Sequence, residues 1–207
     1  MKSFKNDLIQ EKLLATYLNS IYNELGFDFT RINDLDAQHQ GIDVELRFND
    51  KVYQIDEKAQ LHYLNKDIPT FTFELSYLKN HELKKGWLFD ERKITDYYFL
   101  ITGICLQSGK KELTSIGDIS KIKITSVNRR KLIQLLEMKN LSSISLLNYD
   151  YAIRQEQSFG NNYLEELNPK SEGCIYFTEH LSEQPLNLKL NLNYLIRERI
   201  AKRLFEN

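Results

Sequence analysis

The chain has 207 residues, of which 42% are hydrophobic and 12% aromatic, and its 28 basic and 29 acidic side chains leave a net charge of −1. A chain of this length and composition can bury a substantial core. Its near-neutral charge does not by itself indicate a nucleic-acid-binding protein. The apolar runs are too short to span a bilayer, and Cys105 and Cys174 fit no metal-ligand spacing. We therefore expect a globular, cytoplasmic protein.

The first predicted element is a helix over residues 6–25, which contain neither proline nor glycine. Its apolar side chains recur at 4-3-4 spacing and form one stripe: Leu14, Leu18, Ile21 and Leu25. Stepping this stripe back towards the N-terminus reaches Glu11, whose carboxylate is costly on a core-facing side unless a charged group meets it. Glu11 could instead lie in the first turn, where acids favour the helix dipole. Glu24 is a second, less favoured acid on the same helix.

Two strand-like runs follow, over residues 41–48 and 51–59, and the turn-forming pair Asn49-Asp50 lies between them. Both runs alternate between apolar and polar side chains, which is typical of half-buried strands. A two-residue turn of this kind joins antiparallel strands. The sequence therefore predicts a tight β-hairpin.

The predicted hairpin register brings acidic side chains together. Asp43 falls opposite Asp56, and directly opposed residues have Cβ atoms roughly 5 Å apart. A bound divalent cation would remove the repulsion between these carboxylates, and Lys58 lies two residues along the same face. Glu45 shares the face of Asp43 as a reserve ligand, whereas we expect the Glu57 side chain to be solvated. The alternative is an ordinary surface ion pair between Asp56 and Lys58.

Asp43, a gap of twelve residues and then Asp56-Glu57-Lys58 resemble the motif of the PD-(D/E)xK nuclease superfamily. Ile42 stands where the proline of the motif would be, and relatives often lack that proline. With Glu11 on a preceding helix, the order of residues is also similar to that of archaeal-type Holliday junction resolvases. This resemblance covers about residues 8–60.

The resemblance implies an α/β fold with a central mixed β-sheet flanked by helices, as in restriction endonucleases. It also implies a Mg²⁺-dependent endonuclease that hydrolyses phosphodiester bonds in DNA, with Mn²⁺ as a substitute ion. Asp43, Asp56 and the main-chain carbonyl of Glu57 would bind the ion, and Glu11 would bind it directly or through water. Lys58 would orient the attacking water and stabilise the phosphorane.

Basic clusters supply candidates for contacts to DNA. Lys84 and Lys85 lie in a predicted loop over residues 80–86, and Arg129 and Arg130 open a predicted helix, where their charge opposes the helix dipole. Gln60 follows the motif, although Leu64 breaks the Gln-x-x-x-Tyr pattern of the exonuclease branch. For each basic cluster a solvated surface is the alternative.

Further strands are predicted over residues 70–76, 87–89, 96–102, 121–127, 144–149 and 174–177, and further helices over residues 129–138 and 192–205. Residues 70–76 would extend the sheet beside the hairpin and bring Glu74 near the site.

We expect one domain over residues 1–207, with a core over about 1–106 and an elaboration over about 107–207 that grips substrate or forms a homodimer. Two other interpretations remain open. One is a catalytically inactive nuclease-like fold that serves as a nucleic-acid-binding or assembly module. The other is an unrelated structural protein with a solvated hairpin.

Overall fold

A computed structural model describes residues 2–207, with side chains from residue 6 onwards. The chain forms two compact units. Unit 1 comprises the residues up to Ile68 together with Ile94–Val127 and Lys202–Asn207, and unit 2 comprises Pro69–Lys93 and Asn128–Ala201. The boundary expected near residue 106 falls inside unit 1. The two units are divided at residues 68/69, 93/94, 127/128 and 201/202 instead. That the whole chain forms a single domain stays a prediction.

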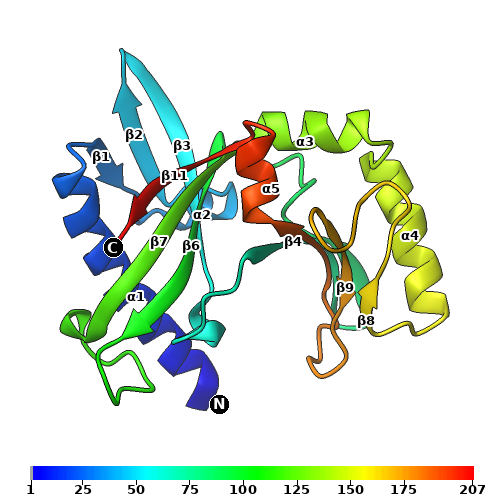
Figure 1. Cartoon of the computed structure of the whole chain (residues 1–207), viewed down its shortest axis with the longest axis horizontal. Coiled ribbons are helices and arrows are strands. Elements are labelled where there is room, and N and C mark those ends of the chain that lie inside the picture. Colours follow the sequence, from blue (N-terminus) through cyan, green and yellow to red (C-terminus); the bar gives the residue numbers. More distant parts are fainter. Residues whose placement is uncertain (1) are drawn as a thin grey trace. The chain divides into compact units, whose positions relative to one another are not determined.

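Unit 1 is an α/β structure built on a six-stranded mixed sheet (Figure 1). In spatial order its strands are β1 (Asp28–Arg31), β2 (Val44–Phe48), β3 (Lys51–Ala59), β6 (Tyr97–Leu106), β7 (Ile119–Asn128) and β11 (Ala201–Glu206). β1, β2 and β3 pair antiparallel, and β3 pairs parallel with β6. The expected class, an α/β fold with a mixed sheet and flanking helices, is confirmed at this level.

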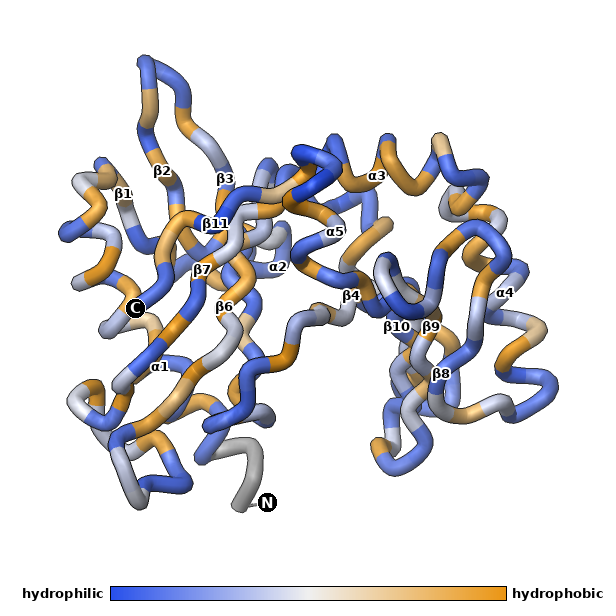
Figure 2. Tube along the Cα trace, viewed as in Figure 1, coloured by the Kyte–Doolittle hydropathy of each residue, from blue (hydrophilic) through white to orange (hydrophobic). Residues whose placement is uncertain are grey.

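The hairpin of β2 and β3 has the predicted turn. Asn49 and Asp50 take the left-handed φ angles of 50° and 58° that a two-residue hairpin turn of this type requires. Phe48 pairs with Lys51, and the register continues along the two strands. The tip of the hairpin is hydrophilic (Figure 2). Local chain chemistry therefore sets the register that carries the acidic residues.

The helix α1 (Lys2–Glu24) covers one face of this sheet, as its apolar stripe predicts. Its buried residues pack with side chains from β2, β3, β6 and β7: Leu14, Leu18, Ile21 and Tyr22. The helix ends before Gly26, whose φ of +69° suits the residue that follows a helix. The described part of the chain has no helix that is both long and apolar enough to cross a membrane.

Three short helical segments complete unit 1. They are α2 (Leu35–His39), η1 (Leu61–Tyr63) and η2 (Ile116–Asp118). Asp34 caps α2 by accepting a hydrogen bond from the Ala37 amide, and this helix leads the chain into β2.

Unit 2 is built on a five-stranded antiparallel sheet. In spatial order its strands are β5 (Glu82–Lys85), β4 (Thr70–Lys79), β10 (Leu186–Asn191), β9 (Gly173–Phe177) and β8 (Gly160–Asn162). Its helices are α3 (Arg129–Met138), α4 (Ser143–Gln155) and α5 (Leu192–Arg197).

Three expectations for residues 70–89 were wrong. The strand at residues 70–76 exists, with Phe71 and Phe73 buried. It belongs to the sheet of unit 2, however, and does not extend the sheet of the hairpin, so Glu74 is also a residue of unit 2. Residues 80–86 were expected to be a loop, but β5 lies there, because Asn80 and His81 form a left-handed two-residue turn. Residues 87–89 form turns and a bend, not a strand.

Two expectations for the C-terminal half were also wrong. Residues 144–149 belong to the helix α4, which Ser142 caps and which buries Leu146, Asp150 and Ile153 at helical spacing. The predicted helix over residues 192–205 ends at Arg197, because the chain reverses at Arg199 (φ 58°) and continues as β11.

Candidate functional site

Unit 1 contains a pocket of about 560 Å³, which we call the acid pocket. Its walls come from α1, the end of β1, the segment leading into β2, and β3. Its charged lining residues are Glu11, Lys12, Arg31, Asp43, Glu57 and Lys58. Four of the residues predicted for the site therefore line one pocket, and Asp56 lies beside them through its contact with Lys58.

Asp43 lies one residue before β2 and is bound to the backbone of β3. Its amide donates to the Ile55 carbonyl (2.8 Å), and its Oδ2 accepts from the Glu57 amide (2.7 Å). Burial, followed by the negative charge of Asp56, raises the pKa of Asp43 from 3.8 to about 7, against the opposing effects of the Glu57 amide and Lys58. The pairing of β2 with β3 ends at Val44 and Ile55, so direct pairing of Asp43 with Asp56 stays a prediction.

Asp56 is the most buried acid at this site, with 2% of its surface exposed. Its neighbour across the parallel pair β3–β6 is Tyr98, which is fully buried. Lys58 Nζ contacts Asp56 Oδ1 at 2.5 Å. Asp56 Oδ2 is buried without a hydrogen-bond partner among the described residues. A buried carboxylate oxygen in this condition is costly unless a ligand or ion meets it.

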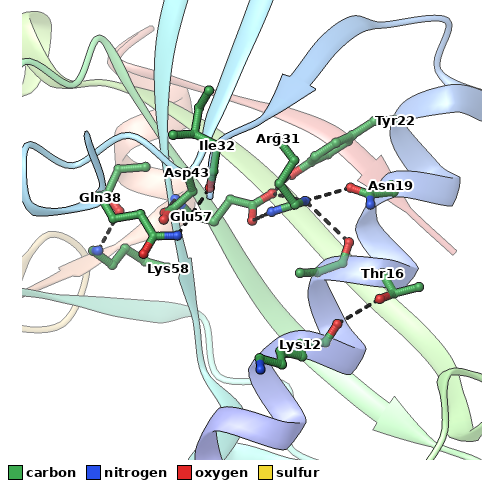
Figure 3. Close-up of polar contacts among 12 residues, drawn as sticks. Lys12, Thr16, Asn19, Tyr22, Arg31, Ile32, Gln38, Asp43, Glu57 and Lys58 are labelled. Atoms are coloured by element: carbon green, nitrogen blue, oxygen red, sulfur yellow. Dashed lines mark hydrogen bonds and ion pairs between the residues drawn. The ribbon is translucent and has the colours of Figure 1, made fainter. Parts of the chain in front are cut away.

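The Glu57 side chain is not solvated, which corrects the expectation from the sequence. Arg31 binds it through two nitrogens, at 2.7 and 3.2 Å, and the Tyr22 hydroxyl donates to it at 2.6 Å. Arg31 also donates to Asn19 and to the Ala15 carbonyl, so it links β1 and α1 to β3 (Figure 3). Burial and then the negative charge of Glu57 raise the pKa of Tyr22.

Sequence reasoning missed Arg31. The sequence does contain a pattern that indicates a buried Arg31, because Phe27, Phe29 and Arg31 alternate over β1 and the residue before it. Phe27 and Phe29 pack against the core, so a cation at the next position on that face requires a buried acid. The identity of that acid depends on a contact 26 residues away, which no local pattern shows.

Glu11 lies on α1 and lines the acid pocket, but it is exposed and not core-facing as the helix stripe predicts. Partial burial and the nearby Asp7 raise the pKa of Glu11, while the positive charges of Lys58 and His62 oppose the rise. Gln60 follows β3 as the residue before η1, and its amide donates to the Ile101 carbonyl at 3.0 Å.

The reserve acids lie elsewhere. Glu24 is exposed at the end of α1, and Glu45 accepts a 3.4 Å hydrogen bond from its cross-strand neighbour Gln54. Neither of them belongs to the described lining of the acid pocket.

Lys84 and Lys85 belong to unit 2, where both lie in β5. Lys84 pairs with Glu82 at 2.5 Å and Lys85 with Glu91 at 3.3 Å. Exposed pairs of this kind contribute little stability, so both ammonium groups remain accessible to an anionic partner.

Arg129 and Arg130 also belong to unit 2, at the start of α3. Arg129 donates to the main-chain carbonyls of Leu88 (3.5 Å) and Asp90 (3.1 Å), and Arg130 is exposed. These carbonyl contacts explain why a cation is favoured at a helix start that would otherwise repel it.

The acid pocket therefore combines carboxylates with the ammonium group of Lys58, and Lys58 contacts Asp56, whose second oxygen is buried without a partner among the described residues. This combination can bind a cation and position a proton-transfer group next to it. Among the described residues, no cluster of three or more His, Cys, Asp or Glu side chains is arranged to hold a metal ion. Any ion bound here would therefore need main-chain oxygens or water to complete its ligands.

Comparison with known proteins gives no match: no protein-family model, no curated protein and no solved structure matches this chain.

Proposed function

We propose that the chain is a Mg²⁺-dependent endonuclease, whose unit 1 has the restriction-endonuclease-like fold and which hydrolyses phosphodiester bonds in DNA. One observation carries the proposal. Asp56 is buried with an unpartnered oxygen, close enough to Asp43 to raise the pKa of Asp43, and Lys58 contacts Asp56 at the pocket wall. Two nearby, largely buried acids repel each other and are unfavourable for folding alone, and cation-assisted hydrolysis gives them a use.

The residues of this site fit a small hard cation. Asp56 Oδ2 is available, Asp43 brings a second carboxylate, and the main-chain carbonyl of Glu57 is the natural third oxygen. Mg²⁺ takes oxygen ligands, often one or two carboxylates, and keeps several waters. When bound, Mg²⁺ would supply Lewis acidity, a more acidic water molecule and compensation of charge on the phosphate.

The side chains of the chain have separate tasks in this proposal. Lys58 orients the attacking water and stabilises the negative charge that develops on the phosphorus oxygens. Glu11, whose pKa is raised by burial, faces the same pocket and can hold or release a proton there. Arg31 fixes Glu57, and through it the backbone amide that holds Asp43.

The test is cleavage of labelled single-stranded, duplex and branched DNA in the presence of Mg²⁺ or Mn²⁺. Wild-type protein should cut at least one of these forms, and EDTA should stop the reaction. Lys58→Ala should abolish cutting. Lys123→Ala is a matched control, because Lys123 is a similarly half-buried, ion-paired lysine on β7 of the same sheet and lies outside the described pocket lining.

The second candidate is an inactive nuclease-like module that binds nucleic acid or assembles with other proteins. The 2.5 Å contact of Lys58 with Asp56 favours it, because that contact already offsets part of the negative charge without an ion. Wild-type protein that binds DNA but cuts none of the forms with either ion would support this candidate against the nuclease.

A further inference from the structure

We infer that the acid pocket holds one unpaired nucleotide, so that the proposed nuclease acts on single-stranded or frayed DNA and not on an intact duplex. This inference rests on the proposed function, because it names the substrate form for the same site. The pocket volume of about 560 Å³ lies within the range of about 300–1,000 Å³ that is typical of sites for small molecules.

Part of the acid pocket lining is apolar. Leu8, Ala59 and Leu61 offer accessible apolar surface there. Leu14, Leu18 and Ile101 also belong to the lining but are buried in the core of unit 1, so they form a rigid wall behind the accessible side chains. The flat face of a nucleobase can cover exposed apolar surface of this kind and remove it from water.

The lining of the pocket also carries amide groups. Gln38 of α2 and Asn33 of the preceding loop both belong to the lining. The Gln38 side-chain nitrogen donates to the Ile32 carbonyl at 3.2 Å, which fixes the side chain and leaves its carbonyl oxygen as an acceptor. Amide groups can pair with the exposed edge of an unpaired base. Lys12, also in the lining, supplies a positive charge for the phosphate backbone.

The position of the candidate catalytic groups makes the pocket favour single-stranded over duplex DNA. Asp43, Glu57 and Lys58 line the same cavity as the apolar side chains Leu8, Ala59 and Leu61. A phosphate held by these groups has its own nucleoside next to the cavity. In a duplex that nucleoside is stacked and paired, and it must be unstacked and unpaired at a cost in free energy before it can enter. In a single strand the base is free to enter, so single-stranded DNA has the advantage.

Binding separates this inference from the chemistry. The Lys58→Ala protein, with Mn²⁺ present, is titrated with three labelled probes: a 20-nucleotide single strand, the same strand in a blunt duplex, and a duplex with a single-stranded tail. We expect the single strand and the tailed duplex to bind at least about tenfold more tightly than the blunt duplex. Equal binding, or tighter binding of the blunt duplex, would overturn the inference.

A pocket-filling variant supplies the second test. Ala15→Leu, made in the Lys58→Ala protein, adds bulk from α1 to the pocket lining without removing a side-chain hydrogen bond. Ala59→Leu does the same from the end of β3, in case the helix variant misfolds. Either folded variant should lose the preference for single strands and keep its Mn²⁺ affinity, whereas Ala152→Leu on the exposed face of α4 should keep both. A folded pocket-filled protein that still prefers single strands would contradict the inference.

Cleavage assays then test whether the protein is a nuclease. Wild-type protein that cuts the tail and spares the blunt duplex supports both the inference and the nuclease. Wild-type protein that cuts blunt duplex at the same rate overturns the inference and keeps the nuclease. If the binding preference is found but no probe is cut with Mg²⁺ or Mn²⁺, the nuclease proposal fails and the pocket assignment stands.

Discussion

Two buried aspartates, one in each unit, allow the ion pair that we propose as functional to be compared with one that joins elements within unit 2. Asp56 and Asp150 are each 2% exposed, and each contacts a cation at 2.5 Å, Lys58 in one case and Arg154 in the other. Asp150 has no buried oxygen without a partner in the described part of the chain, whereas Asp56 has one.

The two cations complete the contrast. Arg154 also donates to the Ser76 hydroxyl (2.7 Å) and to the Gln184 carbonyl (3.1 Å), so it joins α4 to the neighbouring sheet. Lys58 instead lines an open pocket beside a second acid, Asp43. Burial and a short contact are common to both pairs. The remaining hydrogen-bonding capacity and the nearby like charge distinguish the candidate catalytic pair.

The largest expected effect is on cleavage. Asp56→Asn and Lys58→Ala should each lower the rate by at least about 10²–10³-fold, the usual cost of removing one group that stabilises developing charge. Asp56→Asn should also weaken Mn²⁺ binding, while Lys58→Ala should retain the ion and lose only the rate. Single-turnover cleavage and Mn²⁺ titration on both variants measure this difference. If both variants cut normally, the chemistry lies elsewhere.

The next largest effect is on the free energy of unfolding, and it should appear at the ion pair of Asp150 and Arg154. Arg154→Ala leaves Asp150 buried without its partner and should lower the free energy of unfolding by about 3 kcal/mol or more. Asp56→Asn removes repulsion from Asp43 and should leave stability equal or slightly higher. Urea denaturation of both variants without metal provides the comparison. A similar loss at both positions would erase the distinction between the pairs.

Metal binding should stabilise the wild-type protein. An ion that binds only the folded state adds about 2.7 kcal/mol at a concentration of 100 times its Kd. Thermal melting with and without Mn²⁺ should show this shift for wild type and for Arg154→Lys, but not for Asp56→Asn. An equal shift for Asp56→Asn would show that the ion binds at another position.

The smallest effect concerns pH. The pKa of Asp43 rises to about 7 in the folded protein, so between about pH 4 and 7 the folded state binds more protons than the unfolded state. The stability of the metal-free protein should therefore fall as the pH rises through this window, by more than about 1.4 kcal/mol, the equivalent of one pKa unit. Asp43→Asn should flatten the profile. Urea denaturation at pH 5 and pH 8 tests this, and unchanged slopes in the variant would assign the effect to another group.

The sequence predicts well those features whose cause lies within a few residues. The stripe of α1 and the Asn49-Asp50 turn follow from helix and strand periods, and the register of the hairpin follows from the turn. These local features brought Glu11, Asp43 and Lys58 to one pocket.

Features that depend on distant partners were not predictable in this way. The strand β4 alternates between apolar and polar side chains, as a strand that pairs with β3 would also do. Nothing in residues 70–79 indicates that it joins the five-stranded sheet instead. The short apolar run from Ile144 to Tyr149 fits a strand or a helix, and burial of Leu146, Asp150 and Ile153 decides for the helix. Arg31 is missed for the same reason, since its carboxylate partner lies on another strand.

The way in which the chain passes between the units has a consequence for biosynthesis. The chain changes unit four times, at residues 68/69, 93/94, 127/128 and 201/202. The strand β11 therefore leaves the ribosome only after the whole of unit 2 has been made. Until then β7 is an open edge of the sheet in unit 1, and open edges invite pairing with other chains. Lys121 and Lys123 lie on this strand, and charged side chains on a strand edge are a common protection of sheets against such pairing.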